Sequence, residues 1–153
     1  MINSRKLEDL HPTVRDKALK MEKRCEDELG IDLVFTSTYR DDPSQNALYA
    51  IGRTVKGSGI TAKKPMGNVV TNAKAGYSWH NFRLALDVVA VRHGKPVWGT
   101  SGEDGKLWAE IGRIGKECGL EWGGDFKSLK DFPHFQDSKG FTLAQLRSGV
   151  TVA

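Results

Sequence analysis

The feature that most constrains the fold of this chain is an apolar run, Leu84–Val91, that contains a single carboxylate, Asp87. A run of this length, rich in valine, predicts a largely buried β-strand. Side chains alternate along a strand, so Asp87 is expected on the face opposite to Leu86 and Val88. Burying a carboxylate is unfavourable unless it is paired or binds a metal ion. Asp87 is therefore a functional ligand, a partner of one of the many arginines, or part of a solvated strand face.

The segments around this strand combine helical and extended patterns. Apolar residues at helical spacing from Pro12 to Leu29, with Gly30 as a C-terminal cap, predict a first helix. Residues 53–77 have no apolar period and predict a long loop, either a functional flap or a solvated loop. The absence of a regular strand–helix alternation indicates an α+β fold. The other predicted elements are strands at 31–39, 120–122 and 134–135 and helices at 41–51, 103–118 and 143–147.

Length and composition narrow the class of protein. The 153 residues are expected to form one domain with a sizeable core. No stretch approaches the roughly 20 consecutive apolar residues that cross a bilayer, and the first residues lack a signal-peptide pattern, so neither insertion nor secretion is expected. The 2 cysteines cannot form a disulfide framework, which favours the cytosol. The net charge of +4 suits a polyanionic partner, nucleic acid or an anionic cell wall, without identifying one.

Two of the 4 histidines stand near carboxylates at spacings that can assemble a site. His80 precedes the Asp87 strand, and Asp131 lies three residues before His134. Pro133 favours extended backbone before it, so Asp131 and His134 share a side only if the chain turns between them. The alternative for this second segment is a surface loop with an ordinary histidine.

Together, His80, Asp87 and His134 form a ligand set that suits catalytic zinc. Such a site has three protein ligands and keeps one position for water, whereas structural zinc sites use four protein ligands, usually with several thiolates. Zinc lowers the pKa of bound water to about 7, and a second carboxylate, here Asp131, is then needed to move protons. Arg40, at the end of the first predicted strand, is a candidate for the cation beside a developing oxyanion. These residues are the components of a zinc hydrolase.

Four short motifs occur along the chain in an order that matches a known family. They are Thr38-Tyr39-Arg40 with Gln45, Ser78-x-His80-x6-Asp87, Trp122-Gly123-Gly124, and Asp131-x-x-His134. In this order they resemble the motifs of the zinc D-alanyl-D-alanine peptidase family (VanX and VanY types), which includes the L-alanyl-D-glutamate endopeptidases used as phage endolysins. The chain departs from the family at Arg83, where glycine is usual, and at Gln136, where glutamate is frequent. Neither departure removes a predicted ligand.

The resemblance implies a fold of the Hedgehog/D-Ala-D-Ala-peptidase type, an α+β domain with a small antiparallel sheet flanked by helices. Residues 1–153 would form a single catalytic domain without a separate cell-wall-binding domain. The roles that it implies are as follows: zinc ligands His80, Asp87 and His134, general base and acid Asp131, carbonyl-steadying Arg40, and lesser substrate contacts Ser78 and Gln45.

By this resemblance we expect a Zn²⁺-dependent endolysin that hydrolyses the L-alanyl-D-glutamate bond of the bacterial peptidoglycan stem peptide. It would be a monomer that binds no nucleic acid, made without a signal peptide in the cytoplasm of a bacteriophage's host and acting on the cell wall after release. One alternative is D,D-carboxypeptidase or dipeptidase activity on D-Ala-D-Ala. Another is a non-catalytic basic module that binds cell wall or nucleic acid and contains no stoichiometric zinc.

Overall fold

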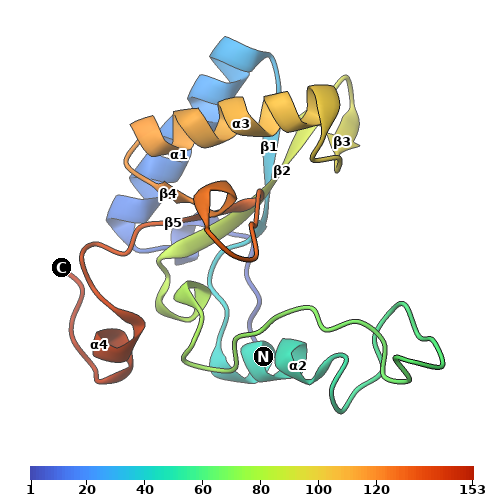
Figure 1. Ribbon diagram of the computed structural model, residues 1–153. Coiled ribbons are helices and arrows are strands. Elements are labelled where there is room, and N and C mark those ends of the chain that lie inside the picture. Colours follow the sequence, from blue (N-terminus) through green and yellow to red (C-terminus); the bar gives the residue numbers. More distant parts are fainter.

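A five-stranded antiparallel sheet organises the chain, and the computed structural model describes residues 1–153 (Figure 1). The strand order is β1-β2-β5-β4, and β3 pairs with the C-terminal end of β2, at residues 90–92. An α+β class with a small antiparallel sheet is therefore confirmed. None of the helices has the length and apolar character needed to cross a membrane. The helices are α1 (Pro12–Leu29), α2 (Asp42–Ala50), α3 (Gly102–Glu117) and α4 (Leu143–Arg147), and the strands are β1 (Asp32–Ser37), β2 (Ala85–Arg92), β3 (Lys95–Val97), β4 (Glu121–Trp122) and β5 (His134–Gln136).

The hydrophobic core lies between one face of the sheet and the two long helices, α1 and α3. Leu86, Val88 and Ala90, at alternate positions of β2, contribute to this core. This confirms the predicted alternation and leaves Asp87 on the other face. Gly115 explains the close packing of α3, because a Cβ atom at this position would lie 2.4 Å from the Phe135 ring.

Most predicted elements are present, with their ends shifted by one or two residues. The first helix begins and ends as predicted, and Gly30 terminates it in the left-handed conformation at φ 63°. The sequence pattern did not predict β3, which follows a turn at His93 and Gly94. Both turn residues have positive φ, 53° and 74°, and close a tight β2–β3 hairpin. A three-residue strand with Pro96 at its centre gives no strand pattern in the sequence.

The segment between α2 and the 3₁₀ helix Trp79–Phe82 contains no regular helix or strand, as predicted for residues 53–77. In Figure 1 it runs beside α2 and extends away from the sheet before it returns toward β2. Its backbone is doubled back on itself, because the Gly57 N–H donates to the Met66 carbonyl oxygen over 2.9 Å. The long loop is therefore a folded projection beside α2 that extends away from the sheet (Figure 1).

Candidate metal centre and adjoining cleft

Two of the predicted ligands are direct neighbours across the sheet. Asp87 in β2 pairs with His134 in β5, and 3.1 Å separate Asp87 Oδ1 from His134 Nδ1. On the other side of Asp87, a bulge in β1 between Phe35 and Ser37 brings Ser37 opposite to it. Bulges of this kind re-aim side chains next to functional sites. The register of three strands thus fixes the position of the carboxylate and of one imidazole.

The third predicted ligand, His80, comes from the 3₁₀ helix Trp79–Phe82, which immediately precedes β2. Ser78 caps this helix, and its Oγ accepts the N–H of His80 over 3.3 Å. The Nε2 of His80 lies 3.3 Å from Asp87 Oδ1. One ligand atom from each of His80, Asp87 and His134 can be chosen so that all lie within 4.8 Å of one another. The structure therefore brings the three predicted ligands together.

The arrangement of these atoms fits a zinc ion. Two ligands at the usual zinc distances and a tetrahedral angle are about 3.4 Å apart, which matches the separations of 3.1 Å and 3.3 Å. The other ring nitrogens face acceptors: His80 Nδ1 lies 2.8 Å from the Thr38 carbonyl oxygen, and His134 Nε2 lies 2.7 Å from Gln136 Oε1. These oxygens only accept, so the facing nitrogens carry the protons. With a metal ion bound, the nitrogens that face Asp87 would be the unprotonated ones, and their lone pairs would be available to the ion.

The charges at the centre are strongly coupled. Burial alone would raise the pKa of Asp87, but hydrogen bonds from His134 and His80 hold that pKa well below its usual range. Burial likewise would lower the pKa of His134, yet the hydrogen bond and charge of Asp87 raise it overall. Asp87 is therefore ionised at neutral pH and could offer an oxygen ligand to a metal ion. A metal ion that binds here has to displace the proton that His134 otherwise attracts.

A turn between Asp131 and His134 places Asp131 beside the centre. The sequence alone did not show whether the chain turns there. The N–H of His134 donates to the Asp131 carbonyl oxygen over 3.1 Å, which closes a turn around Phe132 and Pro133. The Asp131 side chain lines the same cavity as the three candidate ligands and stays partly exposed at its edge. Burial, and next the negative charge of Asp87, raise the pKa of Asp131. This carboxylate is therefore placed beside the centre without belonging to the ligand cluster.

Arg40 also lines this cavity, and two hydrogen bonds fix the position of its guanidinium. Its Nη1 donates to Gln45 Oε1 and its Nη2 to Ser37 Oγ, each over 2.9 Å. Gln45 is fully buried at 0% exposure, and its Nε2 donates to the Ala73 carbonyl oxygen over 2.6 Å. The Gln45 amide therefore contacts Arg40 and the loop rather than open space. Burial lowers the pKa of Arg40, and the Asp87 charge opposes that shift.

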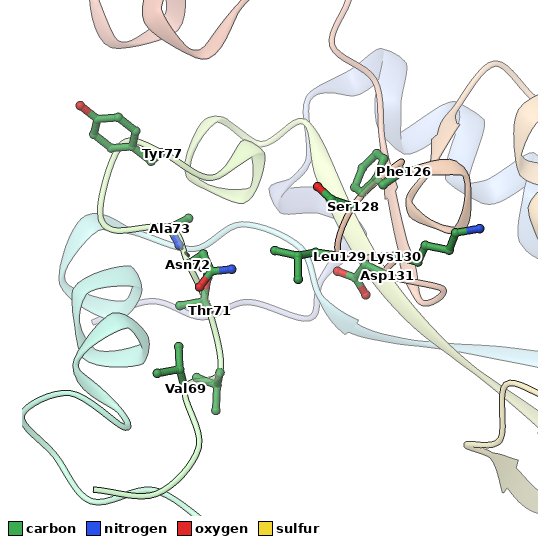
Figure 2. A pocket seen from close by; sticks show the side chains of 11 residues that line it. Val69, Thr71, Asn72, Ala73, Tyr77, Phe126, Ser128, Leu129, Lys130 and Asp131 are labelled. Carbon is green, nitrogen blue, oxygen red and sulfur yellow. Dashed lines mark hydrogen bonds between the residues drawn. The ribbon is translucent and has the colours of Figure 1, made fainter. Parts of the chain in front are cut away.

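The cavity around the centre continues into a wider cleft. The inner cavity, about 330 Å³, is lined by the three candidate ligands together with Arg40, Ser78 and Asp131. The outer one, about 790 Å³, lies between residues 69–77 and residues 126–131, and Figure 2 shows these two walls with Asp131 on the second. The two cavities share Val70, Thr71 and Asp131. A chain-like ligand at the centre would thus have room to extend along the cleft.

Several supporting groups were not predicted from the sequence. The Thr38 carbonyl orients His80, and Ser37 orients Arg40, but a backbone oxygen and a small hydroxyl carry no recognisable signal. Gly123 lies in the Trp122-Gly123-Gly124 motif, which predicts no role for it. The structure gives its role: a Cβ atom there would lie 2.2 Å from the Asp131 carbonyl oxygen. Only glycine allows the chain to pass this close to the Asp131 turn.

The departure at Arg83 has a structural counterpart. Arg83 follows the His80 helix with a left-handed φ of 65°, a conformation that glycine adopts more readily. Its guanidinium lies 3.9 Å from the centre of the Tyr39 ring and donates to the Asp9 carbonyl oxygen over 2.8 Å. The turn thus forms with arginine in place of glycine, and the Arg83 side chain packs on Tyr39.

Comparisons with known proteins find relatives of this chain. A family profile described as D-alanyl-D-alanine carboxypeptidase matches residues 71–137, which include every predicted ligand and Asp131. The chain is also 38% identical over 133 residues to the peptidoglycan L-alanyl-D-glutamate endopeptidase CwlK of Bacillus subtilis (strain 168). That alignment covers 84% of this chain and 73% of CwlK.

Two solved structures share the fold. One is the L-Ala D-Glu endopeptidase ChiX of Serratia marcescens, with a TM-score of 0.55 and 24% identity over 88% of this chain and 87% of ChiX. The other is the LD-carboxypeptidase LdcB, with a TM-score of 0.55 and 19% identity over 97% of this chain and 77% of LdcB. At these identities the two structures support the fold alone.

Proposed function

Because this chain belongs to the D-alanyl-D-alanine carboxypeptidase family of peptidases, we propose that it is a zinc-dependent peptidoglycan peptidase that cleaves the L-alanyl-D-glutamate bond of the stem peptide. The observation that carries the proposal is the convergence of His80, Asp87 and His134 beside Asp131 in one cleft. The bond is chosen because CwlK, the curated relative, is an L-alanyl-D-glutamate endopeptidase by name. Membership of a peptidase family sets aside the alternative of a non-catalytic basic module.

The roles at the centre follow from position. His80, Asp87 and His134 would hold Zn²⁺, which when bound supplies a Lewis acid for the carbonyl oxygen and lowers the pKa of a water molecule. Asp131, at the edge of the inner cavity, would accept a proton from the attacking water and return it to the leaving amine. Its raised pKa favours the second of these steps, because a carboxyl group that holds a proton can donate it.

Arg40 and its partner have separate roles in this proposal. The guanidinium lines the cavity and would stabilise the negative charge that develops on the scissile carbonyl oxygen. Gln45, predicted to be a substrate contact, is fully buried against Arg40, and we propose that it positions that guanidinium. Ser78 caps the His80 helix. It also lines the same cavity, and we propose that it contacts the substrate there.

D,D-carboxypeptidase activity is the second candidate, favoured by the description of the matching family profile. An enzyme of that kind removes a terminal residue, whereas the cleft here continues beyond the centre into the outer cavity. Digestion of purified peptidoglycan followed by mass spectrometry separates the two. The endopeptidase exposes new amino groups on D-glutamate, and the carboxypeptidase releases free D-alanine. Release of D-alanine without cleavage after L-alanine would overturn the proposal.

The biological setting is a further part of the proposal. We propose a bacteriophage endolysin that accumulates in the host cytoplasm as a monomer and reaches the wall after release. The single sheet and shared core support treating residues 1–153 as one catalytic domain. Expression inside bacteria, with and without a membrane-permeabilising protein, tests the setting. Lysis that occurs only after permeabilisation supports it, and lysis without permeabilisation contradicts it.

A further inference from the structure

The positive charge of this chain is concentrated in one segment. Residues 43–86 contain six Lys or Arg and no Asp or Glu, so the segment carries +6. The rest of the chain has 17 basic residues (23 − 6) and 19 acidic residues, which gives −2. The mild net charge of +4 therefore conceals a strong asymmetry. The six basic residues are Arg53, Lys56, Lys63, Lys64, Lys74 and Arg83.

Three of these lysines stand on a folded projection, residues 51–70, which we call the basic arm. Its two sides are joined by backbone hydrogen bonds, from Gly57 to Met66 over 2.9 Å and from Asn68 to Ser58 over 2.7 Å. The sides pack so closely that a Cβ atom on Gly57 would lie 2.9 Å from the Asn68 carbonyl oxygen. The arm is therefore a defined structure whose tip projects away from the sheet (Figure 1).

The lysines of the arm are free to bind a partner. Lys56, Lys63 and Lys64 are all exposed, and none lies within 4.0 Å of a carboxylate. Arg53 differs, because it stacks 3.7 Å from the Tyr49 ring and donates to the Tyr49 and Thr71 carbonyl oxygens. Arg53 thus fixes the base of the arm, while the three lysines extend beyond it into solvent.

The base of the arm is also a wall of the cleft. Val69 lines the outer cavity, and Val70 and Thr71 line both cavities. Figure 2 shows Val69 and Thr71 on the wall that faces Asp131. A polymer that enters the cleft therefore passes the base of an arm that presents several unpaired positive charges.

We propose that the basic arm binds the carboxylates of stem peptides next to the one being cleaved, and so holds the enzyme on polymeric peptidoglycan. The proposal rests on the proposed function for its substrate. The partner is chosen by charge: a strand with repeated carboxylates complements the three exposed lysines of an arm that contains no acidic residue. Each exposed pair contributes little alone and is screened by salt. Several pairs on one polymer act together, because after the first contact the others form within the same complex.

The test compares polymeric and soluble substrates. The variant Lys56→Gln/Lys63→Gln/Lys64→Gln is compared with a matched control, Lys20→Gln/Lys95→Gln/Lys106→Gln, whose exposed lysines lie on α1, β3 and α3. We expect the arm variant to raise KM on purified sacculi about tenfold at low salt. Its kcat/KM on a soluble stem peptide should stay unchanged, and the control should match the wild type on both substrates.

Other results would overturn the proposal. These are an arm variant that behaves like the control on sacculi, or one that loses activity equally on the soluble peptide. Loss of wild-type binding after hydrofluoric acid removes wall phosphate polymers would assign the arm to phosphates instead. Tighter binding to a DNA oligonucleotide than to sacculi would assign it to nucleic acid. If the wild type cleaves no soluble stem peptide, the proposed function fails, while salt-dependent sedimentation with sacculi still tests the arm.

Discussion

The candidate metal centre and the basic arm hold their charged side chains in opposite ways. At the centre, ionisable side chains are buried on strands whose register is fixed, and the ring nitrogens that face away from it are hydrogen-bonded. On the arm, charged side chains are exposed and unpaired, and the backbone is held by its own hydrogen bonds. Chemistry needs groups fixed to within fractions of an ångström, whereas binding a polymer needs charge and reach. Changes at the centre should therefore affect every substrate, and changes on the arm only the polymer.

The largest effect is expected from His134→Ala, because it removes a proposed metal ligand that belongs to the sheet. Zinc content and activity should fall together, and activity on both soluble and polymeric substrates should drop by on the order of 10³ or more. The matched control is His93→Asn, in an exposed turn, since asparagine tolerates the left-handed φ of 53°. A His134→Ala protein that keeps zinc and turnover would show that the centre is assigned wrongly.

Asp131→Asn should separate catalysis from metal binding. We expect zinc to be retained and kcat to fall by about 10² to 10⁴ on both substrates, since asparagine cannot move a proton. Asp125→Asn is the control, because this nearby carboxylate is exposed and paired with Lys116 on the surface. Metal analysis and kinetics check the prediction together. Full activity of Asp131→Asn would exclude it as the general base.

Gln136→Leu should weaken the metal centre without removing a ligand. The Gln136 amide oxygen fixes the His134 ring by accepting its Nε2 proton, so zinc affinity is expected to fall about 10- to 100-fold. Competition with a chelator of known affinity measures this. Gln136→Glu, which restores an acceptor and matches the residue frequent in the family, should recover the affinity. Equal affinity of all three proteins would show that this hydrogen bond does not support the ligand.

The smallest effect concerns the stability of the chelated protein as a function of pH. The raised pKa of His134 stabilises the fold below about pH 6.5, and this contribution is lost as the pH rises through the folded-state pKa. The lowered pKa of Asp87 stabilises the fold above about pH 4, and this contribution is lost as the pH falls through the folded-state pKa.

Thermal unfolding in the presence of a chelator tests this prediction. The Tm of the wild type should exceed that of Asp87→Asn by more near pH 5.5 than near pH 8. Zinc should restore the Tm at pH 8, and a Tm difference that grows toward alkaline pH without zinc would contradict the prediction.

Much of the fold could be predicted because its signals are local. The α1 stripe, the Gly30 cap and the alternation around Asp87 depend on spacing along one segment, and each is present in the structure. Predicting that the three candidate ligands converge required the family resemblance, because no local pattern in the sequence shows that β2 and β5 are neighbours. What the structure adds is the register that places Asp87 opposite His134.

The parts that could not be predicted depend on tertiary contacts. The turn that orients Asp131 lies against the backbone at Gly123, where only glycine leaves enough room. No pattern within residues 131–134 predicts this contact. Gln45 faces inward because Arg40 and the Ala73 carbonyl meet it there, so sequence could not separate a supporting role from a substrate contact. The basic arm lies within the predicted loop, but the sequence does not predict that it doubles back. Its two sides come close because glycines such as Gly57 leave room for the opposite backbone, and these contacts are visible only in the structure.

The most direct test is the metal content of the purified wild-type protein, measured before and after exhaustive chelation. The convergence of His80, Asp87 and His134 predicts about one Zn²⁺ per chain. Chelation should remove both the metal and the hydrolysis of a soluble stem peptide, and added zinc should restore both. A protein that contains no metal, or that hydrolyses the peptide at full rate after its metal is removed, would contradict the assignment of this cluster as a catalytic zinc centre.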